Sequence, residues 1–275
     1  MNNNNKDHVR NFFDNDSTEY LKYKYNENSL SFMALRKQKT IEVLLEYLVP
    51  SLDGNVRILD AGCGPGIMLD FFCNYKLNYF GLDISKEMIS IARHQTAISP
   101  LHLESHFIRG DVENLPFRSD HFNAVISLGV IEYLADDRKF IAELHRVIRP
   151  DGLLLISITN KYSYNLLLDG LIEYLRKKRL AVIILDYLKQ KLRLGQFKER
   201  DFYIRKQYPK SFINELEYHD FKVVMSVNFG FNFLPYPLNL ICGERINNFT
   251  NTLYNKMGKH GIKPLGEGCL VLCRK

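Results

Sequence analysis

The chain has 275 residues, 46% of them hydrophobic, with 18 Phe and 16 Tyr, so it can bury the core of one elaborated domain or of two small ones. Its formal net charge of +6 is uneven: residues 161–275 carry 20 basic against 10 acidic residues, whereas residues 51–160 carry 10 against 14. These values exclude a disordered or fibrous chain, and we expect a globular protein.

The cysteines and the N-terminus bear on the compartment. Five cysteines form no C-x-x-C pair and leave an odd one, which argues against a disulfide framework and against a zinc site, so we expect no metal. MNNNNKDHVR lacks the apolar segment of a signal peptide. The longest aliphatic run, LAVIIL at 180–185, is far shorter than the roughly 20 residues of a membrane span. We expect a cytoplasmic protein.

Strands and helices are predicted to alternate over much of the chain. Apolar residues recur at helical spacing between residues 35 and 48, where Pro50 ends the pattern. Apolar and β-branched runs then predict strands at 55–59, 77–83, 106–109, 122–128 and 153–159, and helical patterns predict helices at 67–75, 86–97 and 136–152. Such alternation predicts a doubly wound parallel sheet with helices on both faces.

This alternation breaks twice in the second half. Residues 161–207 predict two successive helices, and residues 230–263 form an excursion rich in Pro, Asn and aromatic residues. A helix at 209–221 and strands at 222–231 and 268–275 complete the pattern. We therefore divide the chain into a helical cap (1–50), a ligand-binding core (51–160), a helical lid (161–207) and the remainder of the core sheet (208–275).

The segment ILDAGCGPG at 58–66 joins the first strand to its helix. In an open α/β sheet this turn is the floor of the ligand crevice, and glycines let a ligand lie against bare backbone. The dinucleotide fingerprint needs a third glycine where this chain has Ile67, and no G-K-[ST] of a P-loop follows. Asp60 would repel a pyrophosphate and attract an ammonium or sulfonium group.

Two further acids follow the next strands. Asp83 ends the second strand about 20 residues after the loop, where a carboxylate accepts ribose hydroxyls. Asp111 follows the third strand, where it can accept the adenine amino group while the N–H of Val112 reaches a ring nitrogen. Each acid alone is as well explained by a turn or a helix cap. Together with the glycine loop they predict a cationic adenosine compound, S-adenosylmethionine.

Four segments carry a family resemblance. ILDAGCGPG, GLDIS, GDVENLPF and SLGVIEYL, in this order and spacing, resemble the motifs of class I S-adenosylmethionine-dependent methyltransferases, and RVIRPDGLLLIS matches the segment that follows them. The resemblance covers residues 55–160 and implies a mostly parallel, seven-stranded Rossmann-like sheet. It also implies a set of cofactor-binding residues: Asp60, Gly62, Gly64, Asp83, Ile84, Met88, Asp111, Val112, Leu128 and Gly129. From the leading helices, Tyr20 and Arg36 are further candidates, for the cofactor carboxylate.

The acceptor pocket is expected where the fourth and fifth strands end. Tyr133 follows the fourth strand, and Asn160, Tyr162 and Tyr164 follow the fifth. An aromatic wall is a better interpretation of these tyrosines than proton transfer, so the catalytic base stays unknown, with Tyr133 as a weak candidate. SLGV lacks the Asn/Asp-Pro-Pro-aromatic signature of enzymes that methylate planar amines.

The lid is expected to select the acceptor. Residues 166–200 carry nine basic and four acidic residues among Leu, Ile and Tyr, which is typical of a helix that contacts an anionic surface or roofs a lipophilic pocket. We predict methylation, on oxygen, of a small apolar acceptor such as an isoprenoid, quinone, polyketide or lipid-linked intermediate, with peripheral membrane contact through this segment and no DNA partner. Two alternatives remain: an RNA methyltransferase, and a non-catalytic S-adenosylmethionine-binding subunit.

Overall fold

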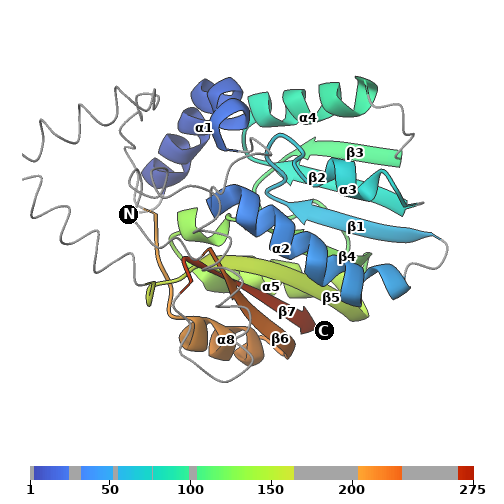
Figure 1. Cartoon of the computed structure of the whole chain (residues 1–275), viewed down its shortest axis with the longest axis vertical. Coiled ribbons are helices and arrows are strands. Elements are labelled where there is room, and N and C mark those ends of the chain that lie inside the picture. Colours follow the sequence, from blue (N-terminus) through green and yellow to red (C-terminus); the bar gives the residue numbers. More distant parts are fainter. Residues whose placement is uncertain are drawn as a thin grey trace, which may run out of the picture.

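The computed structural model describes residues 3–24, 32–51, 55–75, 77–98, 104–163, 204–230 and 266–275, with the backbone alone at 3–4, 16–24, 51 and 98. The strands form a seven-stranded sheet in the order β3-β2-β1-β4-β5-β7-β6 (Figure 1). Their bounds are Val56–Ala61 (β1), Leu77–Asp83 (β2), Glu104–Arg109 (β3), Phe122–Ser127 (β4), Ile148–Thr159 (β5), Lys222–Phe229 (β6) and Gly268–Arg274 (β7). The predicted seven-stranded sheet is confirmed.

Strand direction and order place the ligand crevice. Strands β1 to β5 run parallel to one another, and β7 lies antiparallel between β5 and β6. The chain first builds outward from β1 to β3 and then returns to add β4 on the other side of β1. The strand order therefore reverses between β1 and β4, and the loops that leave these two strands diverge there.

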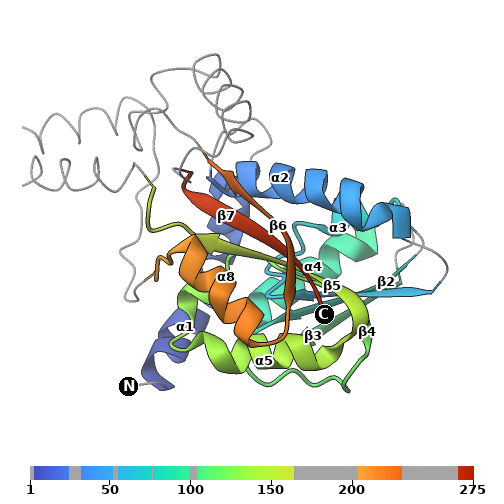
Figure 2. The same cartoon turned by 90° about the horizontal axis from the view of Figure 1, so that it is seen from below.

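Helices cover both faces of the sheet, as predicted. They are α1 (Asn3–Lys24), α2 (Phe32–Tyr47), α3 (Leu69–Phe72), α4 (Lys86–Ile98), α5 (Asp137–Val147) and α8 (Pro209–Tyr218), with short 3₁₀ turns η1 (Val49–Ser51) and η2 (Ile131–Tyr133). Apolar residues of α2, α3 and α4 share one core cluster with the sheet, and those of α5 and α8 share another. Figure 2 shows α2 and α5 on opposite sides of the strands.

Two predicted helices are shorter than their patterns. The helix expected at 67–75 is a single turn, α3, because turns of the glycine loop continue to Met68. The helix expected at 136–152 ends at Val147, and β5 begins at the next residue. There the N–H groups of Asp120 and His121 donate to the carbonyls of Arg146 and Val147, so the backbone turns directly into the sheet.

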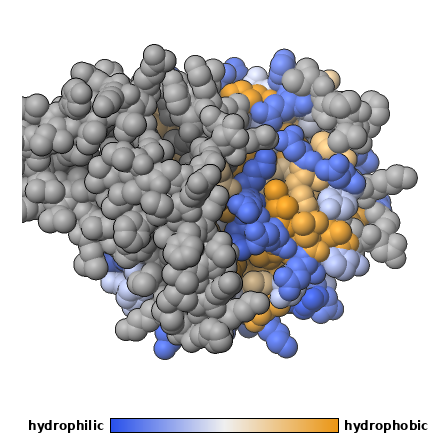
Figure 3. Space-filling model, viewed as in Figure 1, coloured by the Kyte–Doolittle hydropathy of each residue, from blue (hydrophilic) through white to orange (hydrophobic). Residues whose placement is uncertain are grey.

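Helix α1 lies beside α4 at the end of the sheet where the crevice opens (Figure 1). The hydroxyl of Ser85, just before α4, donates to Asp14 of α1 at 2.6 Å. This hydrogen bond links α1 to the start of α4. On the described part of the face in Figure 3, hydrophobic side chains lie among hydrophilic ones, without a continuous apolar surface. None of the described helices is long and apolar enough to cross a bilayer.

Candidate cofactor site

A cavity lies at the carboxyl ends of β1, β2 and β4, with α1 along one side. It brings together most of the residues predicted from sequence, drawn from segments up to about 70 positions apart. Those that line it are Asp60, Gly62, Gly64, Asp83, Ile84, Met88, Asp111, Val112, Leu128, Gly129 and Tyr133. The strand ends and the motifs after them therefore converge on one space, as the doubly wound topology requires.

Asp60, near the end of β1, has a side chain almost closed off from solvent, with 2% exposure. The hydroxyl of Tyr79 on the neighbouring strand donates to its Oδ2 at 2.7 Å. Burial raises the pKa of Asp60 from 3.8 to about 7; the bond from Tyr79 and the charge of Arg36 oppose that rise, and the nearby Asp83 adds to it. A buried carboxyl group with a strongly raised pKa that lines a cavity is typical of a functional site.

Asp83 organises the glycine loop. Its Oδ2 accepts from the N–H of Gly64 at 2.9 Å, and its Oδ1 accepts from the N–H of Ser85 at 2.9 Å. Burial raises the pKa of this carboxyl group, and the backbone N–H groups oppose the rise. Each oxygen keeps further acceptor capacity, so the carboxylate can hold the loop and still accept hydroxyl groups of a ligand in the cavity.

Asp111 has a partner that the sequence did not reveal. Its Oδ2 accepts from Nζ of Lys6 on α1 at 2.7 Å, and the same ammonium group is paired with Glu113. Its Oδ1 accepts from the N–H of Glu113 at 2.9 Å. Helix α1 is thus joined by an ion pair to the loop after β3, on the side of the cavity where adenine recognition was predicted.

Lys6, Val9 and Phe13 line the cavity from α1. Their spacing of three and four residues places them on one helical face, but this spacing does not indicate what the face contacts, so the sequence analysis did not find Lys6 and Val9. Val130 and Leu134 add apolar wall from the segment after β4. The walls are therefore more apolar than the motif residues alone suggested.

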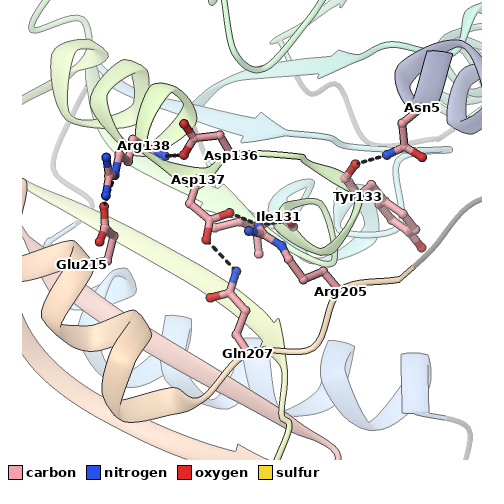
Figure 4. A network of polar contacts seen from close by, with 9 residues as sticks. All are labelled: Asn5, Ile131, Tyr133, Asp136, Asp137, Arg138, Arg205, Gln207 and Glu215. Carbon is pink, nitrogen blue, oxygen red and sulfur yellow. Dashed lines mark hydrogen bonds and ion pairs between the residues drawn. The ribbon is translucent and has the colours of Figure 1, made fainter. Parts of the chain in front are cut away.

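Tyr133 is held in place from two sides. Its ring packs edge-on against Phe13 with centroids 5.5 Å apart, and its carbonyl accepts from the amide of Asn5 at 3.1 Å. Arg205 anchors the same 3₁₀ turn: its backbone N–H donates to the carbonyl of Glu132, and its guanidinium bonds the carbonyl of Ile131. Figure 4 shows the bonds from Asn5 and Arg205 to this turn. Asp137 forms an ion pair with Arg205 and accepts a hydrogen bond from the amide of Gln207.

Several predicted residues do not line this cavity. Arg36 is 2% exposed and lies directly behind Gly129, with Nη1 4.0 Å from Glu132. Asn160 is fully buried, and its amide donates to the carbonyl of Gly266 at 2.8 Å while accepting from the N–H of Tyr162 at 2.9 Å. It ties the end of β5 to the chain before β7.

Tyr162 lies away from the cavity as well. It is 54% exposed and packs on Tyr208, with ring centroids 4.8 Å apart. The side chain of Tyr20, the whole of Tyr164, and the segments 164–203 and 231–265 of the lid and the aromatic excursion lie outside the described residues. Among the residues that the structure describes, no group of three or more His, Cys, Asp or Glu side chains forms a metal site.

Comparisons with known proteins agree with this geometry. Residues 59–156 match the methyltransferase domain family. The chain is 33% identical over 98 residues to a malonyl-[acyl-carrier protein] O-methyltransferase of Enterobacter lignolyticus, covering 36% of this chain and 37% of that protein. It is 32% identical over 101 residues to a phthiotriol/phenolphthiotriol dimycocerosates methyltransferase of Mycobacterium ulcerans, covering 36% of each. The chain thus spans less than half the length of these relatives.

A similar solved structure extends over the whole fold. Magnesium protoporphyrin IX methyltransferase from Synechocystis, solved with bound S-adenosylhomocysteine, has a TM-score of 0.62 at 15% identity, with 98% of this chain and 99% of that chain covered. Residues 59–156 therefore match a methyltransferase domain, and the resemblance to class I S-adenosylmethionine-dependent methyltransferases seen in the sequence is confirmed. The expectation of S-adenosylmethionine as cofactor is supported by the same comparisons.

Proposed function

We propose that this protein is an enzyme that transfers the methyl group of S-adenosylmethionine to a small, largely apolar acceptor, on an oxygen atom. The observation that carries the proposal is the convergence of Asp60, Asp83 and a bare glycine backbone on one cavity with apolar walls. Methyl transfer from a sulfonium is an in-line displacement, so the protein must mainly align the reacting atoms and exclude water.

The residues of the cavity fit this cofactor. Asp60 would attract the ammonium group of the methionine portion, Asp83 would accept the ribose hydroxyls, and Asp111 would accept the adenine amino group after releasing Lys6. Ile84 and Met88 would pack against the adenosine. Leu128 and Gly129 would border the methyl donor, and Arg36 behind Gly129 would supply positive charge towards the cofactor carboxylate. Bound S-adenosylmethionine supplies the electrophilic methyl group.

An apolar acceptor is supported by the wall that faces this end of the cavity. Phe13, Tyr133 and Leu134 line it, and Tyr133 is packed edge-on against Phe13, which suits an aromatic wall. The names of two relatives specify malonyl-[acyl-carrier protein] and phthiotriol/phenolphthiotriol dimycocerosates; the first names an O-methyltransferase, which agrees with transfer to oxygen. We assign the lid at 161–207 and the excursion at 230–263 to acceptor selection.

Substitution of Gly64 tests cofactor binding without changing a side chain of the hydrophobic core. Its φ is +52°, and a methyl group added there would meet no atom within 4 Å apart from its chain neighbours. We expect Gly64→Ala to fold with a stability loss of about 1–2 kcal/mol from the left-handed backbone. Its affinity for S-adenosylhomocysteine should fall at least about tenfold by calorimetry, because the methyl group projects towards the ligand.

Gly230→Ala is the matched control for this variant. Gly230 also has a positive φ, of +76°, but its added methyl group would make ordinary contacts at 3.4 Å outside the cavity. This control should lose similar stability and keep its affinity. Equal affinity losses in both variants would mean that backbone strain, not cofactor contact, explains the effect.

Methyl transfer itself is tested with S-adenosylmethionine tritiated at the methyl group and an extract of metabolites and RNA. We expect label in an organic-soluble product with the wild-type protein and much less label with Gly64→Ala at the same cofactor concentration. Label recovered in RNA, with activity that falls steeply as salt rises, would support an RNA methyltransferase instead. Tight cofactor binding with no transfer to any fraction would support the non-catalytic subunit.

A further inference from the structure

A hydrogen bond buried beneath the cavity joins two strands of the core. Tyr79 of β2 donates its hydroxyl to Oδ2 of Asp60 on β1 at 2.7 Å. Tyr79 is fully buried, and its ring packs against those of Phe72 and Phe107, with centroid distances of 5.7 and 5.9 Å. Packing against these rings restricts the direction of the hydroxyl.

The hydroxyl of Tyr79 is not needed to fill this space. A phenylalanine would present the same ring to Phe72 and Phe107, and a buried hydroxyl group costs free energy unless it is hydrogen-bonded. The hydroxyl donates instead to a carboxyl oxygen of a residue that lines the cavity. The hydroxyl thus acts on Asp60, and through Asp60 on whatever the cavity binds.

The charge state of Asp60 depends on burial and on three neighbouring groups. Burial raises its pKa to about 7, the hydrogen bond from Tyr79 lowers it, Asp83 raises it and Arg36 lowers it. Cys63 of the glycine loop also faces Asp60, and burial keeps the pKa of its thiol well above the ordinary value, so it stays neutral. Near neutral pH, Asp60 is divided between an ionised and a neutral form.

We propose that Tyr79 is a positioning residue of the cofactor site: its hydroxyl binds one oxygen of Asp60, stabilises the ionised form and leaves the other oxygen for the cofactor's ammonium group. The inference rests on the proposed function. Only the ionised carboxyl group attracts the ammonium group strongly, so cofactor affinity depends on pH through Asp60. Binding below neutral pH then releases a proton from Asp60.

Calorimetry with S-adenosylhomocysteine across roughly pH 5.5–8.5 tests this inference. For the wild type we expect affinity to fall as the pH drops below about 7, approaching tenfold per pH unit. For Tyr79→Phe the curve of affinity against pH should move to higher pH. Each pH unit of this shift corresponds to about a tenfold loss of affinity at acidic pH. The deficit should shrink as the pH rises towards the upper end of the range.

Tyr75→Phe is the matched control, because Tyr75 is partly buried against the same apolar cluster and packs on Phe71. Its pH profile should coincide with that of the wild type. A Tyr79→Phe profile lowered by one constant factor at every pH would show a merely structural role and overturn the inference. A wild-type affinity that is flat with pH would also overturn it, while leaving the proposed function intact.

Wild-type titrations near pH 6.5 in two buffers of different ionisation enthalpy keep the test independent of whether Tyr79→Phe folds. We expect net proton release on binding, and no release would overturn the inference. Failure of the wild type to bind S-adenosylhomocysteine at any pH would overturn the proposed function together with the inference. Failure of the inference alone is therefore distinguishable from failure of the proposed function.

Discussion

Replacing Asp83 by alanine should lower the affinity for S-adenosylhomocysteine by about a hundredfold or more, because two charge-assisted hydrogen bonds at about 1.5–3 kcal/mol each are removed. The loss has a second source. The same carboxylate accepts from the N–H groups of Gly64 and Ser85, so the glycine loop also loses its attachment to the end of β2. Calorimetry measures the affinity, and thermal unfolding measures the cost to the fold.

Two further variants separate these sources. Asp83→Asn keeps the size and one acceptor oxygen, so it should retain most of the thermal stability and show an intermediate loss of affinity. Asp70→Ala removes a carboxyl group from α3, where it is largely exposed and 3.7 Å from Lys37, and should leave affinity unchanged. Wild-type affinity in Asp83→Ala would remove this residue from the cofactor site.

The cofactor motifs were predictable because their signals are local. A glycine loop after a buried strand, and an acid at the end of the next strand, can each be read from a few adjacent residues. Parallel topology then brings the carboxyl ends of the strands to one edge of the sheet. The proximity of Asp60, Asp83 and Asp111 can therefore be predicted without knowing the tertiary contacts. This explains why the seven-stranded fold and the cavity floor agree with the sequence analysis.

The contacts of Lys6 and Tyr79 were not predictable in the same way. Lys6 meets Asp111 across 105 positions, and that contact depends on how α1 docks against the loop after β3. Tyr79 reaches Asp60 because strands β1 and β2 pair with Ile58 opposite Tyr79, which places the ring close to the carboxyl group. Helix docking and strand register are tertiary properties, so a residue pattern alone did not specify them.

Asn160 and Tyr162 illustrate a different difficulty. Both follow β5, and position alone suggested the acceptor pocket. The amide of Asn160 instead closes a turn onto Tyr162 and bonds Gly266, and this turn directs Tyr162 towards Tyr208. A side chain that organises its own backbone has the same place in the sequence as one that binds a ligand.

Replacing Asp60 by asparagine should have opposite effects on stability and on binding. The folded pKa of Asp60 is raised from 3.8 to about 7, so the folded chain holds this proton more tightly than the unfolded chain does. The stability that the proton contributes is fully present below about pH 4 and is lost as the pH rises through about 7. Asparagine cannot ionise, and its carbonyl oxygen can still accept from Tyr79.

Without cofactor, the stability advantage of Asp60→Asn over the wild type should therefore be larger at about pH 8 than at about pH 5, by roughly 2–3 kcal/mol. Urea unfolding at the two pH values measures the difference. Asp70→Asn, at an exposed site, should show no such dependence on pH. A stability difference of the same size at both values would mean that packing, not ionisation, separates Asp60→Asn from the wild type.

The same variant should bind S-adenosylhomocysteine more weakly at about pH 8, because a neutral amide attracts the ammonium group less than a carboxylate does. The free protein thus carries a destabilising ionised carboxyl group in its core whose energetic cost falls when a cation enters the cavity. Binding and folding are linked through this one group, so cofactor should raise the unfolding free energy of the wild type more than that of Asp60→Asn. An equal rise in both proteins would separate Asp60 from ammonium recognition.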